Sequence, residues 1–334
     1  MAPELDYYVV EVCSDYGTGV CITILCNGKR IIVNFLPPKS LGRTIEGPLI
    51  ERFHEPYLDE ENEGETAVLD EIQGIVLDVA KPLFYRLAPP VTTGTQVIDL
   101  HSLLYPETFY LRFATVNDKA EILEDNSSAE RYVSQPRTII DNDLELPRYS
   151  SKDIQVLEMI RGRQGEVTRV LVDGREMCCK CGEPFEWEAI VWEYDCLSRI
   201  EQFRQHGSFP RVPKLTGLVT SADSGQVVGI LEEYIPINRE SISTLRDVEP
   251  SIIPYEVRKK WASQIREMVD FLHGIDIVWG DGKPQNVLVH SETDDAWLIN
   301  FGGGWTDEWV DEEFKETLEG DEQAVQRIFM FLAV

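Results

Sequence analysis

The sequence contains no long apolar segment. None of its runs approaches the ~18 consecutive apolar residues that a membrane-spanning helix needs. Its start also lacks the basic residues, apolar core and small-residue cleavage site of a secretory signal peptide. We therefore expect a soluble, intracellular protein of the cytoplasm that does not bind a membrane.

Positive charge is scarce. The 334 residues include 31 Lys and Arg against 59 Asp and Glu, which gives a formal net charge of −28. A surface of this kind repels phosphate groups at long range, so we expect no extensive binding of nucleic acid. The apolar content of 43% and aromatic content of 10% are typical of a globular protein rather than a disordered one.

A regular cysteine framework is also absent. The seven cysteines are an odd number at irregular spacings, which argues against a secreted, disulfide-bonded domain. Cys178, Cys179 and Cys181 are close enough in sequence to suggest zinc. A fourth ligand at a conventional spacing is missing, however, and neighbouring residues of a strand point to opposite faces. We favour buried thiols on a strand.

The sequence does contain a polar loop followed by a hairpin, at residues 274–304. Two short β-branched runs, 286–290 and 296–301, flank an acidic turn, and this pattern predicts the hairpin. The polar residues flank it in the sequence: Asp281, Lys283 and Asn286 at its start, and Asn300 at its end.

A second pattern lies upstream, at residues 153–203. Two glycines, Gly162 and Gly165, precede Val167 and a strand-like segment, and a predicted Asp-Gly hairpin turn leads to Lys180 in the run M-C-C-K. Residues 187–203 then have helical periodicity and carry Glu193 as a partner for Lys180. Glu188, about one and a half turns earlier, is the alternative partner.

Two further elements connect these patterns. The apolar run 227–235, VVGILEEYI, predicts a strand that ends in Glu-Glu-Tyr and includes Glu233. Residues 255–273 have the apolar spacing of an amphipathic helix, which leads directly into the polar loop.

In order, these segments resemble the glycine-rich loop, lysine strand, partner helix, hinge, catalytic loop and metal-binding motif of protein kinases. The runs VWGDGKPQN, DAWLINFGGG and TDEWVDEE resemble in particular the fungal protein kinase-like family, with N-F-G in place of D-F-G. The resemblance implies an α+β, protein kinase-like two-lobed fold over 153–334, with a small lobe at 153–235 and a large lobe at 236–334. Because the chain stops at Val334, we expect a truncated C-terminal lobe.

Residues 1–117 are expected to form a β-rich accessory domain. Strand-like runs cover 7–12, 20–26 and 31–35, with a hairpin turn at 26–29 and one helix over 68–83. We expect residues 100–113 to be a loop that runs into a strand. Residues 118–152 are rich in Asp, Glu, Ser and Pro, and we interpret them as a linker.

The resemblance also assigns roles to individual residues. Asp281 would orient the acceptor hydroxyl, and Lys283 would neutralise the transferring phosphoryl group. Asn286 and Asn300 would hold magnesium, although the neutral Asn300 is a weaker ligand than the aspartate it replaces. ATP and magnesium are the implied cofactors. The residues expected to bind the nucleotide are Gly162, Gly165, Val167, Lys180, Glu193 and Glu233.

Three functions remain open at this stage. The first two are an atypical kinase-like phosphotransferase, acting on an unidentified small molecule or protein, and an ATP-binding pseudokinase. The alternative is a kinase-derived fold used in biosynthesis, such as aminoacyl-tRNA-dependent synthesis of an arginine-containing cyclodipeptide in a fungal secondary-metabolite pathway. Under that alternative tRNA would be a partner, and the acidic surface would need a local basic patch such as 161–169.

Overall fold

The computed structural model describes most of the chain, which divides into two compact units. The described residues are 5–14, 19–38, 44–54, 63–90, 98–125, 140, 144–162, 166–182, 187–204, 210–238 and 242–334. Unit 1 comprises Met1–Val97 and Ser102–Ser134, and unit 2 comprises Ile98–His101 and Gln135–Val334. The molecule is mixed α+β, with a β-rich N-terminal unit, and is consistent with a kinase-like fold.

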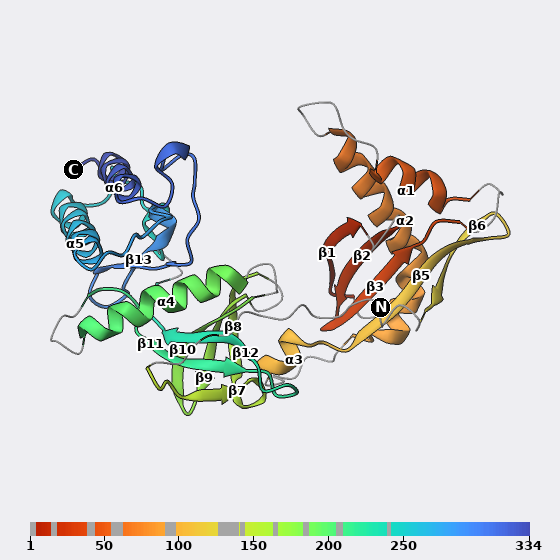
Figure 1. The fold of residues 1–334 in the computed structure, drawn as a ribbon. Coiled ribbons are helices and arrows are strands. Elements are labelled where there is room, and N and C mark those ends of the chain that lie inside the picture. Colours follow the sequence, from red (N-terminus) through yellow and green to blue (C-terminus); the bar gives the residue numbers. More distant parts are fainter. Residues whose placement is uncertain are drawn as a thin grey trace. The chain divides into compact units, whose positions relative to one another are not determined.

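Unit 1 is a five-stranded sheet with two helices packed against it (Figure 1). The strand order is β1-β2-β3-β5-β6, and all neighbours are antiparallel except β3 and β5. The helices α1 and α2 lie in the connection between these two strands and make it long enough for the crossover that a parallel pair needs. The bounds are β1 Tyr7–Ser14, β2 Val20–Cys26, β3 Lys29–Phe35, α1 Glu46–His54, α2 Glu63–Leu87, β5 Thr108–Val116 and β6 Lys119–Glu124.

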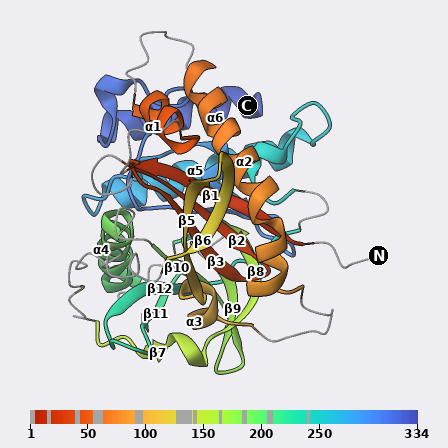
Figure 2. The same ribbon diagram turned by 90° about the vertical axis from the view of Figure 1, so that its right-hand side faces the viewer.

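Local sequence explains these elements. The turn between β2 and β3 consists of Asn27 and Gly28, both at positive φ, as an Asn-Gly hairpin turn requires. The predicted helix 68–83 lies within α2, whose apolar residues share one hydrophobic core with those of the sheet. Figure 2 shows the course of α2 along the sheet. Residues 100–113 differ from the expected loop, because the short helix α3 (Leu100–Leu104) precedes β5.

Unit 2 begins with a seven-stranded sheet of order β4-β8-β9-β10-β12-β11-β7. Helix α4 (Trp187–Arg204) packs against it through its apolar side. Ile98–Asp99 joins this sheet as the edge strand β4. The other strands are β7 Arg148–Ser150, β8 Gln155–Arg161, β9 Val167–Val172, β10 Arg175–Cys181, β11 Leu215–Thr220 and β12 Val227–Glu233.

The rest of unit 2 is mainly helical. Helices α5 (Tyr255–His273) and α6 (Leu318–Leu332) lie side by side (Figure 1). Between them in sequence are the polar loop and the hairpin of β13 (Val287–Val289) and β14 (Ala296–Leu298). One hydrophobic core joins α4, α5, α6, this hairpin and strands β11 and β12.

Two short strands lie in the range interpreted as a linker, and a short segment near residue 100 belongs to unit 2. β6 and β7 both lie within 118–152, the range interpreted as a linker, and Ile98–His101 belongs to unit 2. β6 is half-exposed and carries charged residues on its outer positions. Whether residues 1–117 fold independently stays a prediction.

Candidate functional site

The expected pair of Lys180 and Glu193 is formed. Lys180 Nζ lies 2.5 Å from Glu193 Oε1, and the two side chains are 13% and 5% exposed. Alternation along β10 directs Lys180 away from the face on which Cys179 and Cys181 lie. Helix α4 supplies Glu193 from its buried side, whereas Glu188 is exposed, so Glu193 rather than Glu188 is the partner.

A second carboxylate also contacts Lys180, and the sequence analysis missed it. Glu232 Oε1 lies 3.1 Å from Lys180 Nζ, and the Glu232 side chain is 3% exposed. Burial alone would lower the pKa of the Lys180 ammonium, but the charges of Glu193 and Glu232 outweigh burial and raise it. The signal in the sequence was the Glu-Glu pair that ends an apolar strand, since alternation places one of the two glutamates on the Lys180 face.

Glu193 also connects the sheet to the polar loop region. Its Oε1 accepts a hydrogen bond of 3.0 Å from the backbone N–H of Phe301. The next residue, Gly302, approaches α4 so closely that an added Cβ would lie 2.8 Å from the carbonyl oxygen of Ala189. The position of α4 is therefore fixed from both sides, by Lys180 and by residues 301–302.

Asp281 is the centre of a second polar cluster. Its carboxylate contacts the ammonium of Lys283 and accepts hydrogen bonds from Thr306 Oγ1 at 2.8 Å and from Asn286 Nδ2 at 3.0 Å. Lys283 Nζ donates in turn to Thr306 Oγ1 at 2.9 Å. The structure thus brings together three predicted residues and adds Thr306, which the sequence analysis overlooked because it lies 25 residues beyond Asp281.

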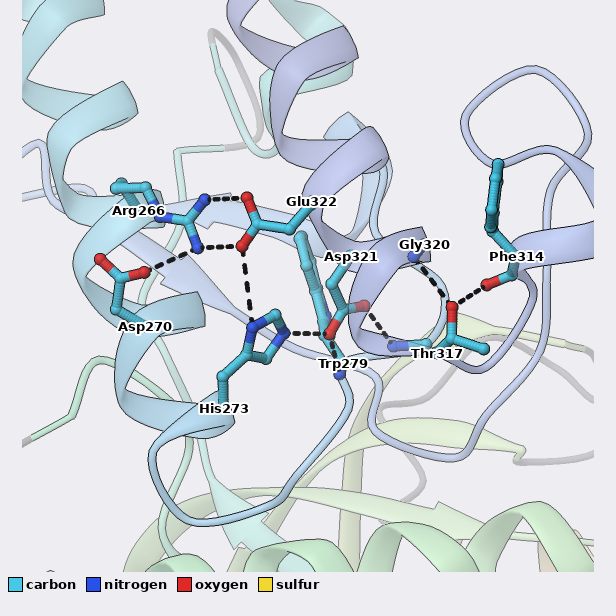
Figure 3. Close-up of polar contacts among 10 residues, drawn as sticks. Arg266, Asp270, His273, Trp279, Phe314, Thr317, Gly320, Asp321 and Glu322 are labelled. Atoms are coloured by element: carbon cyan, nitrogen blue, oxygen red, sulfur yellow. Dashed lines mark hydrogen bonds and ion pairs between the residues drawn. The ribbon is translucent and has the colours of Figure 1, made fainter.

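The loop that carries Asp281 is held by Asp321, near the start of α6 (Figure 3). The buried Asp321 carboxylate accepts from the backbone N–H groups of Trp279 and Gly280, at 2.8 and 2.9 Å. His273 Nε2 lies 2.8 Å from the same carboxylate. Burial raises the pKa of Asp321, although these three donors oppose the effect.

Further ion pairs extend this arrangement to α5. Arg266 contacts Glu322 through two nitrogens, at 2.7 and 2.8 Å, and Asp270 at 2.8 Å (Figure 3). The side chain of Thr317 caps α6 by accepting from Gly320 N at 3.0 Å. The start of α6 is therefore fixed where Asp321 can hold the loop.

For the remaining predicted residues the structure gives the backbone conformation, the place in a strand or the exposure, as follows. Asn300 has a φ of 69°, a left-handed conformation that Asn and Asp adopt more readily than most residues. Gly162 has a φ of 70°, and Val167 begins β9 opposite Arg161 of β8. Gly165 lies outside the described residues. Glu233 is exposed, and its backbone N–H donates to Lys214 O at 2.8 Å.

The expectation of buried thiols on a strand holds for two of the three neighbouring cysteines, whereas Cys178 is half-buried. Cys179 and Cys181 are buried, with their Sγ atoms 3.5 Å apart. Among the described residues there is no group of three or more His, Cys, Asp or Glu side chains that could hold a metal ion.

Comparison with known proteins supports a protein kinase-like relationship. The serine/threonine-protein kinase OXI1 of Arabidopsis thaliana is 28% identical over 120 residues, which is 36% of this chain and 25% of the relative's length. The chain therefore spans about a quarter of the relative that it matches. No family model matches. Among the described helices, none has the length and apolar character needed to span a membrane.

Proposed function

We propose that unit 2 binds an adenine nucleotide at Lys180 and acts as an atypical kinase-like protein with weak phosphotransfer or none. The observation that supports this most is the buried contact of 2.5 Å between Lys180 and Glu193, which continues to the backbone of Phe301. In protein kinases a lysine–glutamate pair of this kind places the lysine against the α and β phosphates. We also propose, from VWGDGKPQN and DAWLINFGGG, membership of the fungal protein kinase-like family.

The residues around Asp281 fit part of what phosphotransfer and magnesium binding require. Asp281 would accept the proton of an acceptor hydroxyl, and Lys283 would offset charge on the transferring group. The amide nitrogen of Asn286 is directed at Asp281, which leaves its oxygen available to magnesium. Asn300 would supply a second neutral oxygen. This donor set fits a nucleotide whose own phosphates provide most of the magnesium ligands, with weaker support from the protein than two carboxylates would give.

Binding can be tested by the thermal shift with ATP, with and without magnesium. A ligand that binds only the folded state raises the melting temperature. We expect a shift for the native chain and none for Lys180→Met, whereas Lys259→Met, which removes an exposed lysine of α5, should leave the shift unchanged. The proposal is wrong if the native chain shows no shift with ATP under either condition.

Phosphotransfer is tested separately, by the release of ADP and by labelling of the chain. Product that disappears in Asp281→Asn, while ATP binding remains, would identify an atypical phosphotransferase. Binding without product would identify a pseudokinase. A folded chain that binds no nucleotide would instead favour the biosynthetic alternative, which is then tested by adding aminoacyl-tRNA and analysing the products.

A further inference from the structure

Lys180 is surrounded by more negative charge than it can neutralise. Glu193 is the nearer partner at 2.5 Å, and Glu232 is the more distant one at 3.1 Å. All three side chains are largely removed from solvent. One ammonium therefore faces two carboxylates, and the site carries an excess negative charge wherever both are ionised.

The strand register explains why Glu232 rather than Glu233 reaches Lys180. Glu232 of β12 lies directly opposite Cys178 of β10, and residues opposite each other in an antiparallel pair share a face. Cys178 and Lys180 are two residues apart on β10 and also share that face. Glu233 points the other way and is exposed. The contact between Glu232 and Lys180 thus follows from the sheet itself and does not depend on a flexible loop.

This second carboxylate is costly to bury. Glu193 already satisfies the lysine charge at short range, and removing a further carboxylate from water costs several kcal/mol unless a partner offsets it. The groups that face Glu232 are Lys180 and Cys178 of β10 and Glu193 of α4, while Leu215 is its neighbour on β11. Burial raises the pKa of Cys178 to about 12, so its thiol stays neutral and offers no compensating charge.

The pKa of Glu232 depends on the same two effects, the cost of burying its charge and the attraction of Lys180. Burial raises it, the positive charge of Lys180 lowers it, and the negative charge of Glu193 raises it further, so that the net shift is upward. The ion pair with Lys180 therefore does not fully offset the cost of burial. Glu232 is therefore held less firmly than Glu193, and its Oε1 lies 3.1 Å from the Lys180 ammonium, the positive group that an anion would approach.

We propose that Glu232 is a specificity-determining residue that keeps phosphate groups away from Lys180, so that a nucleotide's phosphates contact this lysine only when Glu232 is displaced or neutral. The inference rests on the proposed function, since it concerns the same lysine. It makes a distinction between ligands: repulsion acts on a phosphorylated nucleotide and not on a nucleoside, which carries no phosphate. Glu232 thereby favours ligands with little negative charge at this end of the site.

The test compares ADP and adenosine, both without metal, by calorimetry at pH 8. Glu232→Gln keeps the size of the side chain and removes the charge. We expect it to bind ADP at least about tenfold more tightly than the native chain, because a charged contact is worth about that factor. Adenosine affinity should change by less than about twofold. Glu176→Gln is the matched control, since Glu176 is an exposed carboxylate on the same strand as Lys180, and it should change neither affinity.

Equal changes for both ligands, or no gain for ADP, would overturn the inference. If the native chain binds ADP and Glu232→Gln binds it no better, the inference fails while the proposed function stands. If no variant binds either ligand, both fail. Glu232→Met serves as a second variant that removes the charge with an apolar side chain of similar length, and it should show the same preference for ADP. Cooperative thermal unfolding of each variant shows that the comparison is between folded proteins.

Discussion

The two polar clusters of unit 2 differ in how completely their charges are satisfied. Around Asp281, one carboxylate meets one ammonium and accepts hydrogen bonds from one hydroxyl and one amide group. Around Lys180, one ammonium meets two buried carboxylates, and the second is held at longer range. The difference suggests that the Asp281 cluster is held in one arrangement, whereas the Lys180 cluster can respond to a ligand or to pH.

The largest expected effect comes from removing the support of the Asp281 cluster. Asp321→Ala deprives two backbone N–H groups and His273 of their shared acceptor in a buried place. We expect a loss of about 3 to 5 kcal/mol in the free energy of unfolding, measured by urea denaturation. Glu319→Ala, an exposed position in the first turn of the same helix, should cost less than about 1 kcal/mol. Similar losses in both variants would show that Asp321 is not a special anchor.

The second largest expected effect is a pH dependence of stability caused by Glu232, the second carboxylate at Lys180. The pKa of Glu232 is raised from 4.5 to about 7, so its contribution to stability is fully present below pH 4.5 and is lost as the pH rises through 7. Glu232→Gln has no carboxyl group at this position and therefore lacks this pH-dependent contribution. We expect the variant to gain on the native chain between pH 5 and pH 8, by up to about 3 kcal/mol in the free energy of unfolding.

Urea denaturation at several pH values measures this gain. Glu176→Gln is the control variant, since it removes an exposed carboxylate of the same strand as Lys180, one that pairs with Arg169. Parallel profiles for the native chain and Glu232→Gln would mean that Glu232 titrates near its ordinary range and that the two clusters are equally well satisfied.

The connection between the clusters is tested at Gly302. An added Cβ would lie 2.8 Å from the backbone oxygen of Ala189 and 3.3 Å from its Cβ. Gly302→Ala must therefore push α4 away and lengthen the contacts of Glu193 with Lys180 and Phe301. We expect a loss of about 1 to 3 kcal/mol in unfolding free energy and weaker ATP binding. Gly74→Ala, in a helix of unit 1 where the Cβ would meet open space, should be neutral or stabilising, and a matching loss there would remove this interpretation.

The features that could be predicted from the sequence are those that depend on local patterns. Lys180 and Glu193 are placed by strand alternation and helical periodicity, both of which are local patterns. Asp281, Lys283 and Asn286 are close in sequence, so a single loop brings them together. The Asn-Gly hairpin of unit 1 was likewise predictable from two residues.

Other features depend on contacts that no local pattern contains. Glu232 meets Lys180 only because β12 pairs with β10, and the register of that pair cannot be read from either strand alone. Thr306 reaches Asp281 from beyond the hairpin. The short strand β4 joins the sheet of unit 2 although most of its neighbours in sequence belong to unit 1. Within 118–152, β6 pairs with β5 and β7 pairs with β11, and composition reports solvent exposure but not such pairing.

The smallest expected effect concerns Asn300, a neutral residue at the position where protein kinases have the aspartate of D-F-G. Its left-handed φ of 69° suits Asp nearly as well as Asn, so Asn300→Asp should fold normally. The new carboxylate would give magnesium a charged ligand, and we expect magnesium–ADP to bind about tenfold more tightly, with no gain for ADP in EDTA.

Asn117→Asp, an exposed asparagine that also has positive φ, should leave both affinities unchanged. A gain that persists in EDTA would contradict a magnesium contact, because a carboxylate without a cation can only repel the phosphates. Asn300→Asp can also be combined with Glu232→Gln in one double variant. If the two sites act independently, the change in magnesium–ADP affinity of the double variant should equal the product of the changes measured for the two single variants.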